Sequence, residues 1–121
     1  MTAAQLWRTR LREALLSARK DRDTTRVSAL RSALSAIDNA ETPDGARVDA
    51  GSSGTIAGGV VGLGAAEVAR RDLSDAEIRS LLQGEIDEWL AAAREIDASH
   101  SKRAASLRAG AAVLGNLLGD V

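Results

Sequence analysis

The segment spanning residues 26–41, RVSALRSALSAIDNAE, constrains the fold more than any other part of the chain. Its large apolar residues are three, four and three positions apart, at Val27, Leu30, Leu34 and Ile37. This spacing follows the period of an α-helix and places the four side chains on one face. Arg31 and Asn39 lie off that face, where they are free to meet solvent or a partner. The segment therefore predicts an amphipathic helix.

Three further segments show the same spacing. A helix over residues 2–19 is predicted to bury Ala4, Trp7, Leu11, Leu15 and Ala18. A helix from residue 74 is predicted to bury Ile78, Leu82, Ile86, Trp89, Ala93 and Ile96. A helix after residue 101 is predicted to bury Ala104, Leu107, Ala111, Leu114 and Leu118. Ser74 is a favoured N-cap, and Glu77, three residues on, completes a capping box. Residues 20–23 form a polar break, in which Asp21 or Asp23 caps the helix over residues 23–40.

At 121 residues, the chain is predicted to be one all-α domain of about four helices. Because short connections favour antiparallel neighbours, we expect one helical hairpin over residues 2–41 and a second over residues 74–118. Residues 42–72 join the hairpins and contain the only proline and seven of the eleven glycines, which predicts a flexible connection. The only aromatic residues, Trp7 and Trp89, both stand at core spacing, so Leu, Ile, Val and Ala must supply most of the core.

The charged side chains are unevenly distributed along the chain, although the formal net charge is −1. Residues 1–40 have a net charge of +4, residues 41–69 of −3 and residues 70–121 of −2. A face that binds a polyanion is therefore expected on the first two helices. The basic cluster there consists of Arg19, Lys20, Arg22, Arg26 and Arg31.

Two interpretations of this basic cluster are open. Its arginines contact phosphate, because a planar guanidinium donates to two oxygens at once. Alternatively, they are solvated and paired with nearby carboxylates. Arg19, Arg22 and Arg26 share a face if the break between the two helices is mild. RNA recognition usually adds aromatic stacking, and the core spacing of Trp7 and Trp89 leaves no ring available for it.

No motif in the sequence predicts catalysis, a metal or a cofactor. The absence of cysteine excludes disulfides, thiol catalysis and thiolate metal sites. His100 is the only histidine and is interpreted as a helix-boundary residue. The GSSG run at residues 51–54 is faintly similar to the serine loop of amidases, but it lacks a matching lysine partner and is interpreted as a linker. Glu85 and Glu88 are interpreted as part of a solvated face or as partners of an arginine across the hairpin.

Neither a secretion signal nor a membrane span is indicated by the sequence. The N-terminal stretch MTAAQLWRTRLREALL lacks the apolar core of a signal peptide. The longest uncharged run, residues 50–66, is rich in glycine and shorter than a helix that spans a bilayer. We therefore expect a cytoplasmic protein.

Two blocks of sequence resemble the YqeY family, small helical proteins related to the tail domain of the B subunit of the tRNA-dependent glutamine amidotransferase. The blocks are LRSALSAIDNAE at residues 30–41 and LSDAEIRSLLQGEI at residues 73–86. They occur in the order found in the family, and the resemblance covers residues 1–41 and about 70–118. The chain departs from the family in its longer, glycine-rich connection. It also lacks the tyrosine-leucine-proline junction and the second helical domain of longer members, so it is expected to match their first domain only.

The resemblance implies a non-catalytic accessory domain of the tRNA amidotransferase type, which contacts tRNA or a protein partner. Family proteins are described under carbon–nitrogen ligase activity with glutamine as amide donor, but no catalytic residues can be placed on this sequence. The expected tRNA-binding residues lie on the first two helices: Arg19, Arg22, Arg26 and Arg31 for phosphate, and Asn39 for a base edge or backbone group. The alternative is a protein–protein interaction module with no RNA role. A stand-alone amide-transferring enzyme is the least supported reading.

Overall fold

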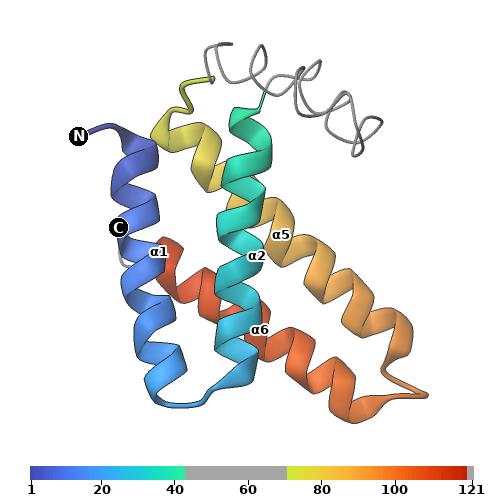
Figure 1. Cartoon of the computed structure of the whole chain (residues 1–121). Coiled ribbons are helices and arrows are strands. Elements are labelled where there is room, and N and C mark those ends of the chain that lie inside the picture. Colours follow the sequence, from blue (N-terminus) through green and yellow to red (C-terminus); the bar gives the residue numbers. More distant parts are fainter. Residues whose placement is uncertain (43–70, 120–121) are drawn as a thin grey trace, which may run out of the picture.

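The computed structural model describes residues 1–42 and 71–119, which form four α-helices (Figure 1). They are α1 (Ala3–Lys20), α2 (Thr24–Glu41), α5 (Asp75–Ile96) and α6 (Ser101–Gly119). The described ranges contain no strand, so the all-α prediction is confirmed. The predicted helix ends lie within about two residues of those observed. Most of the expected flexible connection over residues 42–72, including the GSSG run, lies outside the described residues.

Helices α1 and α2 lie side by side and run in opposite directions (Figure 1). Side-chain contacts join the pair at one end and cap α2 at the other. Near the start of α1, the Arg8 guanidinium bonds Asp38 at 2.6 Å and forms a two-pronged pair with Glu41, both near the end of α2. At the other end, Asp23 caps α2 by accepting a hydrogen bond from the Arg26 backbone N–H at 3.1 Å. Of the two predicted caps, Asp23 therefore holds α2.

The turn between α1 and α2 is a Schellman motif centred on Arg22. The Arg22 N–H donates to the Arg19 carbonyl at 3.1 Å, and the Asp23 N–H donates to the Ala18 carbonyl at 2.9 Å. Both bonds satisfy carbonyls that the end of a helix would otherwise leave unpaired. The motif requires a left-handed backbone at its central residue, and Arg22 has a φ of 55°. A non-glycine residue adopts this conformation at a cost of about 1–2 kcal/mol.

Helices α5 and α6 form the second pair, with α2 packed against both of them and α1 against α5. The predicted capping box begins α5: the Glu77 N–H donates to Ser74 Oγ, and the Ser74 N–H donates to Glu77 Oε1, both at 3.1 Å. Arg79 near the start of α5 donates to the Leu118 carbonyl near the end of α6 at 3.4 Å. The two helices therefore run in opposite directions (Figure 1).

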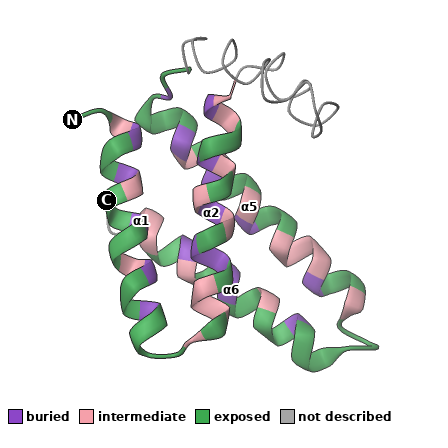
Figure 2. Ribbon diagram, in the orientation of Figure 1, coloured by how far each residue is buried: buried purple, intermediate pink, exposed green. Residues whose placement is uncertain are grey.

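The buried residues, coloured purple on the ribbon of Figure 2, come from all four helices, and most of them form one core. In α1, the buried residues are those predicted: Ala4, Trp7, Leu11, Leu15 and Ala18. In α2, Leu30 and Ile37 are fully buried, whereas Val27 and Leu34 are only partly covered. Alanines fill the rest of that face, because Ala29 and Ala33 are also fully buried. Small side chains at these positions let neighbouring helices approach closely, which suits a core with so few aromatic rings.

The end of α2 and the approach to α5 meet at one point. The Arg71 N–H donates to the Glu41 carbonyl at 2.9 Å. Leu73, just beyond, is buried together with Ile78 of α5, and the two occupy the N′ and N4 positions of a hydrophobic staple. This hydrogen bond therefore joins the end of α2 to the residues that lead into α5.

Candidate functional site

A surface depression beside the α1–α2 turn gathers three of the predicted site residues. It has a volume of about 470 Å³, and its lining comprises Arg19, Arg22, Thr24, Val27, Ser28 and Arg31. Arg19 comes from the last turn of α1, Arg22 from the Schellman turn, and Arg31 from α2. The reversal of the chain at Arg22 therefore brings together arginines that the sequence separates by up to 12 positions. We call this the arginine depression.

The three arginines of this depression are exposed and have no carboxylate partner among residues 1–42 and 71–119. Arg8 provides the contrast, because Asp38 and Glu41 occupy its guanidinium. Three uncompensated positive charges around one concave surface create a local positive potential although the chain as a whole is nearly neutral. The hydroxyls of Thr24 and Ser28 add uncharged hydrogen-bond donors beside them.

The other two predicted residues, Arg26 and Asn39, do not line the arginine depression. Arg26 pairs with Asp21 at 3.1 Å and contacts Ser17 Oγ at 3.5 Å. Because the break between α1 and α2 is a full reversal, Arg26 does not continue the face of Arg19. Asn39 is exposed on α2, eight residues beyond Arg31, which corresponds to about 12 Å along the helix.

A second depression adjoins the first and contains a residue that the sequence reasoning placed in the core. It has a volume of about 320 Å³, and its lining comprises Thr24, Thr25, Ser28, Trp89, Arg103, Ser106 and Leu107. Trp89 is half-buried rather than buried, and it packs against the core from α5. Apolar spacing gave no sign of this exposure, because spacing reports the direction of a side chain and not how much of a large ring is covered. We call this the Trp89 depression.

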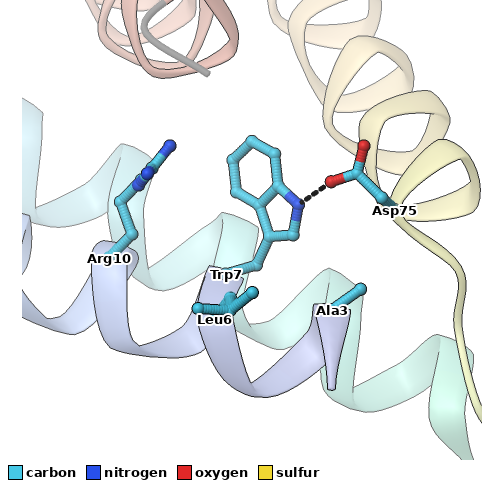
Figure 3. A pocket seen from close by; sticks show the side chains of 5 residues that line it. All are labelled: Ala3, Leu6, Trp7, Arg10 and Asp75. Carbon is cyan, nitrogen blue, oxygen red and sulfur yellow. Dashed lines mark hydrogen bonds between the residues drawn. The ribbon is translucent and has the colours of Figure 1, made fainter. Parts of the chain in front are cut away.

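The other tryptophan closes a contact between α1 and α5 (Figure 3). Trp7 Nε1 donates to Asp75 Oδ1 at 2.8 Å, and Arg79 Nε donates to Asp75 Oδ2 at 2.7 Å. The Arg79 and Arg10 guanidinium carbons lie 5.4 and 5.8 Å from the Trp7 ring centroid, within cation–π range. The hydrogen bond from Arg79, and then that from Trp7, lowers the pKa of Asp75 below its ordinary value.

This tryptophan contact borders a third depression, lined by Ala3, Leu6, Trp7, Arg10 and Asp75 (Figure 3). Both oxygens of Asp75 already accept hydrogen bonds, so the carboxylate has a structural task in joining α1 to α5. The depression is mainly apolar, and Leu6 on its rim is 56% exposed. Its chemistry suits an apolar contact better than acid–base work.

Two acidic residues, Glu85 of α5 and Asp97 directly after α5, each have a partner on another helix. Glu88 is exposed, as expected for a solvated face, whereas Glu85 is half-buried and accepts a hydrogen bond from Ser32 Oγ of α2 at 2.9 Å, so its partner is a serine and not an arginine. Asp97 pairs with Arg108 at 3.3 Å. Within residues 1–42 and 71–119, no group of His, Cys, Asp or Glu side chains is arranged to hold a metal ion. His100 lies just before α6, where its carbonyl accepts from the Ala104 N–H at 2.9 Å.

The described helices also bear on membrane insertion. None of α1, α2, α5 or α6 combines the length and the apolar character needed to cross a bilayer.

Comparison of the chain with family models, curated proteins and solved structures finds no match. The YqeY resemblance therefore remains a hypothesis that rests on the two sequence blocks.

Proposed function

We propose that this chain is a non-catalytic accessory domain that binds the phosphate backbone of RNA at the arginine depression. The observation that carries the proposal is the convergence of Arg19, Arg22 and Arg31 on one concave surface, without a carboxylate partner in the described part of the chain. Positive side chains that protein carboxylates leave uncompensated are available to phosphate. Guanidinium groups suit phosphate because they donate two parallel hydrogen bonds.

The backbone around Arg22 supports the same proposal. A Schellman turn favours glycine at its central position, and this chain has an arginine there instead. Strained backbone conformations concentrate at functional sites, where the surrounding structure holds a side chain in a required position. The hydrogen bonds from Arg22 to Arg19 and from Asp23 to Ala18 fix the turn on both sides. The Arg22 backbone is thus fixed, and its side chain lines the same depression as those of Arg19 and Arg31.

Transfer RNA is the RNA that the sequence resemblance favours. By that resemblance, the chain is an accessory domain linked to a tRNA-dependent amidotransferase, which is a carbon–nitrogen ligase with glutamine as amide donor. The arginine depression has no nucleophile–base pair beside it, and its hydroxyls belong to Thr24 and Ser28, neither of which has a neighbouring histidine or carboxylate on the rim. The proposed role is therefore binding in the cytoplasm and not catalysis.

A titration with tRNA at low and at physiological salt tests this proposal. The Arg19→Ala/Arg31→Ala double variant removes two charges from the depression and should weaken tRNA binding. It should also make the affinity less dependent on salt, because fewer phosphates are contacted. A matched control is Arg94→Ala/Lys102→Ala, which removes two exposed charges from α5 and α6 that lie outside the depression. Equal losses of affinity in the two double variants would indicate diffuse electrostatic attraction and contradict a defined site.

The alternative function, a protein–protein interaction module, is favoured by a separate observation. Leu6 and Leu16 of α1 are 56% and 54% exposed, and Leu6 borders the apolar depression at Trp7. Absence of tRNA binding at both salt concentrations would favour this alternative. In that case Leu6→Ala should weaken binding of the protein partner, and added salt should have little effect.

A further inference from the structure

We infer that the Trp89 depression receives an unpaired RNA base whose phosphate lies in the arginine depression. This inference rests on the proposed function, because it assumes that the arginines hold phosphate. It adds that the ligand presents a single-stranded nucleotide at this point, and that Trp89 provides the surface on which its base stacks.

The two depressions are adjacent because they share lining residues. Thr24 and Ser28 belong to both, and they lie one helical turn apart at the start of α2. On one side of these two residues are the three guanidinium groups of the arginine depression. On the other side lies the Trp89 ring. A nucleotide likewise carries a charged phosphate and an aromatic base, so the two adjoining depressions together offer a partner for each.

The Trp89 ring is held in place by the helix opposite. It packs against Gly110 of α6 so closely that a Cβ added at Gly110 would lie 2.6 Å from the ring atom Cε3, which is inside contact distance. Gly110 itself is buried. The ring therefore has a fixed backing on the α6 backbone, and a base meets an aromatic surface that needs no rearrangement before stacking. Binding surfaces that are already ordered lose less conformational entropy on association.

The rim of the Trp89 depression is suited to the edge of a base. Arg103 lines it and has no ion-pair partner within the described helices. The hydroxyls of Thr25 and Ser106 lie beside it and both donate and accept hydrogen bonds. An arginine and two hydroxyls around an indole ring can satisfy the polar edge of a stacked base.

A single-stranded ligand follows from the chemistry of stacking. In an RNA duplex the bases stack on one another, so their faces are unavailable to a protein ring. Single-stranded loops and ends expose those faces, and aromatic residues then bind them with little dependence on sequence. The structure thus changes the expectation that no ring is available for RNA: Trp7 is buried, but Trp89 lines an open depression.

The test compares two single-stranded RNA probes of about six nucleotides that carry the same number of phosphates, one of uridines and one of abasic ribose phosphates. The uridine probe should bind wild-type protein about tenfold more tightly and quench its tryptophan emission, because only this probe can stack. Trp89→Leu keeps an apolar side chain in contact with the core and should abolish the preference for uridine. Arg19→Ala/Arg31→Ala should weaken binding of both probes and leave the preference in place.

Failure of the inference and failure of the proposed function give different results. Equal affinity of wild-type protein for the two probes would overturn the base site and leave the phosphate site standing. Binding of neither probe, together with no binding of tRNA, would overturn the proposed function. If Trp89→Leu unfolds, as circular dichroism would show, the affinities of wild-type protein for the two probes still test whether a base is bound. Arg103→Ala, an exposed substitution, then provides the second variant and should reduce the preference for uridine.

Discussion

Gly110 is the position at which a single methyl group should disturb the fold most selectively. A Cβ added there would overlap the Trp89 ring, with the ring atoms Cε3 and Cη2 at 2.6 and 3.2 Å. Gly115 lies on the same helix, is exposed and has nothing within 4 Å of the corresponding position. The pair Gly110→Ala and Gly115→Ala therefore compares the same chemical change in one helix with and without a ring in the way.

The two substitutions are expected to change the free energy of unfolding in opposite directions. In an unobstructed helix, replacing glycine by alanine raises the free energy of unfolding by about 1 kcal/mol, which is the prediction for Gly115→Ala. At Gly110 the same gain is opposed by overpacking, which costs about 1–3 kcal/mol in a filled site. Because the added Cβ lies inside contact distance of several ring atoms and Trp89 also packs against the core, we expect the upper part of that range. The net result for Gly110→Ala is then a loss of about 1–2 kcal/mol, and the two variants should differ by about 2–3 kcal/mol.

Urea unfolding followed by circular dichroism gives the free energies without relying on either tryptophan as a probe. The emission of folded Gly110→Ala supplies a second reading, because a displaced Trp89 is more hydrated and should emit at longer wavelength. Equal stabilisation of the two variants would refute the reasoning. It would mean that Trp89 moves aside at no cost and is not a fixed surface, which would also weaken the case for base stacking.

Three further predictions follow from the described contacts. Arg22→Gly should raise the free energy of unfolding by about 1 kcal/mol, because glycine adopts the left-handed backbone without strain, yet it should weaken RNA binding; unfolding and tRNA titrations on one sample check both. Ser74→Ala removes the N-cap of α5 and should lower stability by about 1 kcal/mol in thermal unfolding. Because the pKa of Asp75 is lowered in the folded protein, its contribution to the free energy of unfolding is complete above about pH 4 and is lost as pH falls through the folded-state pKa. Urea unfolding at neutral and at acid pH should therefore show that acid lowers the stability of Asp75→Asn less than that of wild type.

The helices were predictable because large apolar residues carry a strong periodic signal. In α1 the five predicted residues are those that the structure buries. The capping box at Ser74 and Glu77 was equally readable, because its chemistry is local in sequence. The buried alanines of α2, Ala29 and Ala33, were missed. Alanine is common on exposed and buried helix faces alike, so only the approach of a neighbouring helix shows which alanines are covered.

The site was less predictable because it depends on contacts between distant parts of the chain. Trp7 meets Asp75 across 68 positions, and no local pattern connects them. The ion pair of Arg26 with Asp21 depends on the angle of the turn between α1 and α2, which the sequence indicated only as a polar break. The basic composition of residues 1–40 did indicate the correct hairpin for a cluster of unpaired arginines. The residue shown to adjoin that cluster, Trp89, lies on another helix.

The Arg71 N–H donates to the Glu41 carbonyl, so the two ends of the segment between these residues are held side by side. The entropy of closing a loop grows only with the logarithm of its length, at about 0.6 kcal/mol per doubling. Length at this point is therefore nearly decoupled from the stability of the four helices. A fluorescent reporter or a second folded domain with closely spaced ends is expected to fit there without changing the registry of α2 and α5.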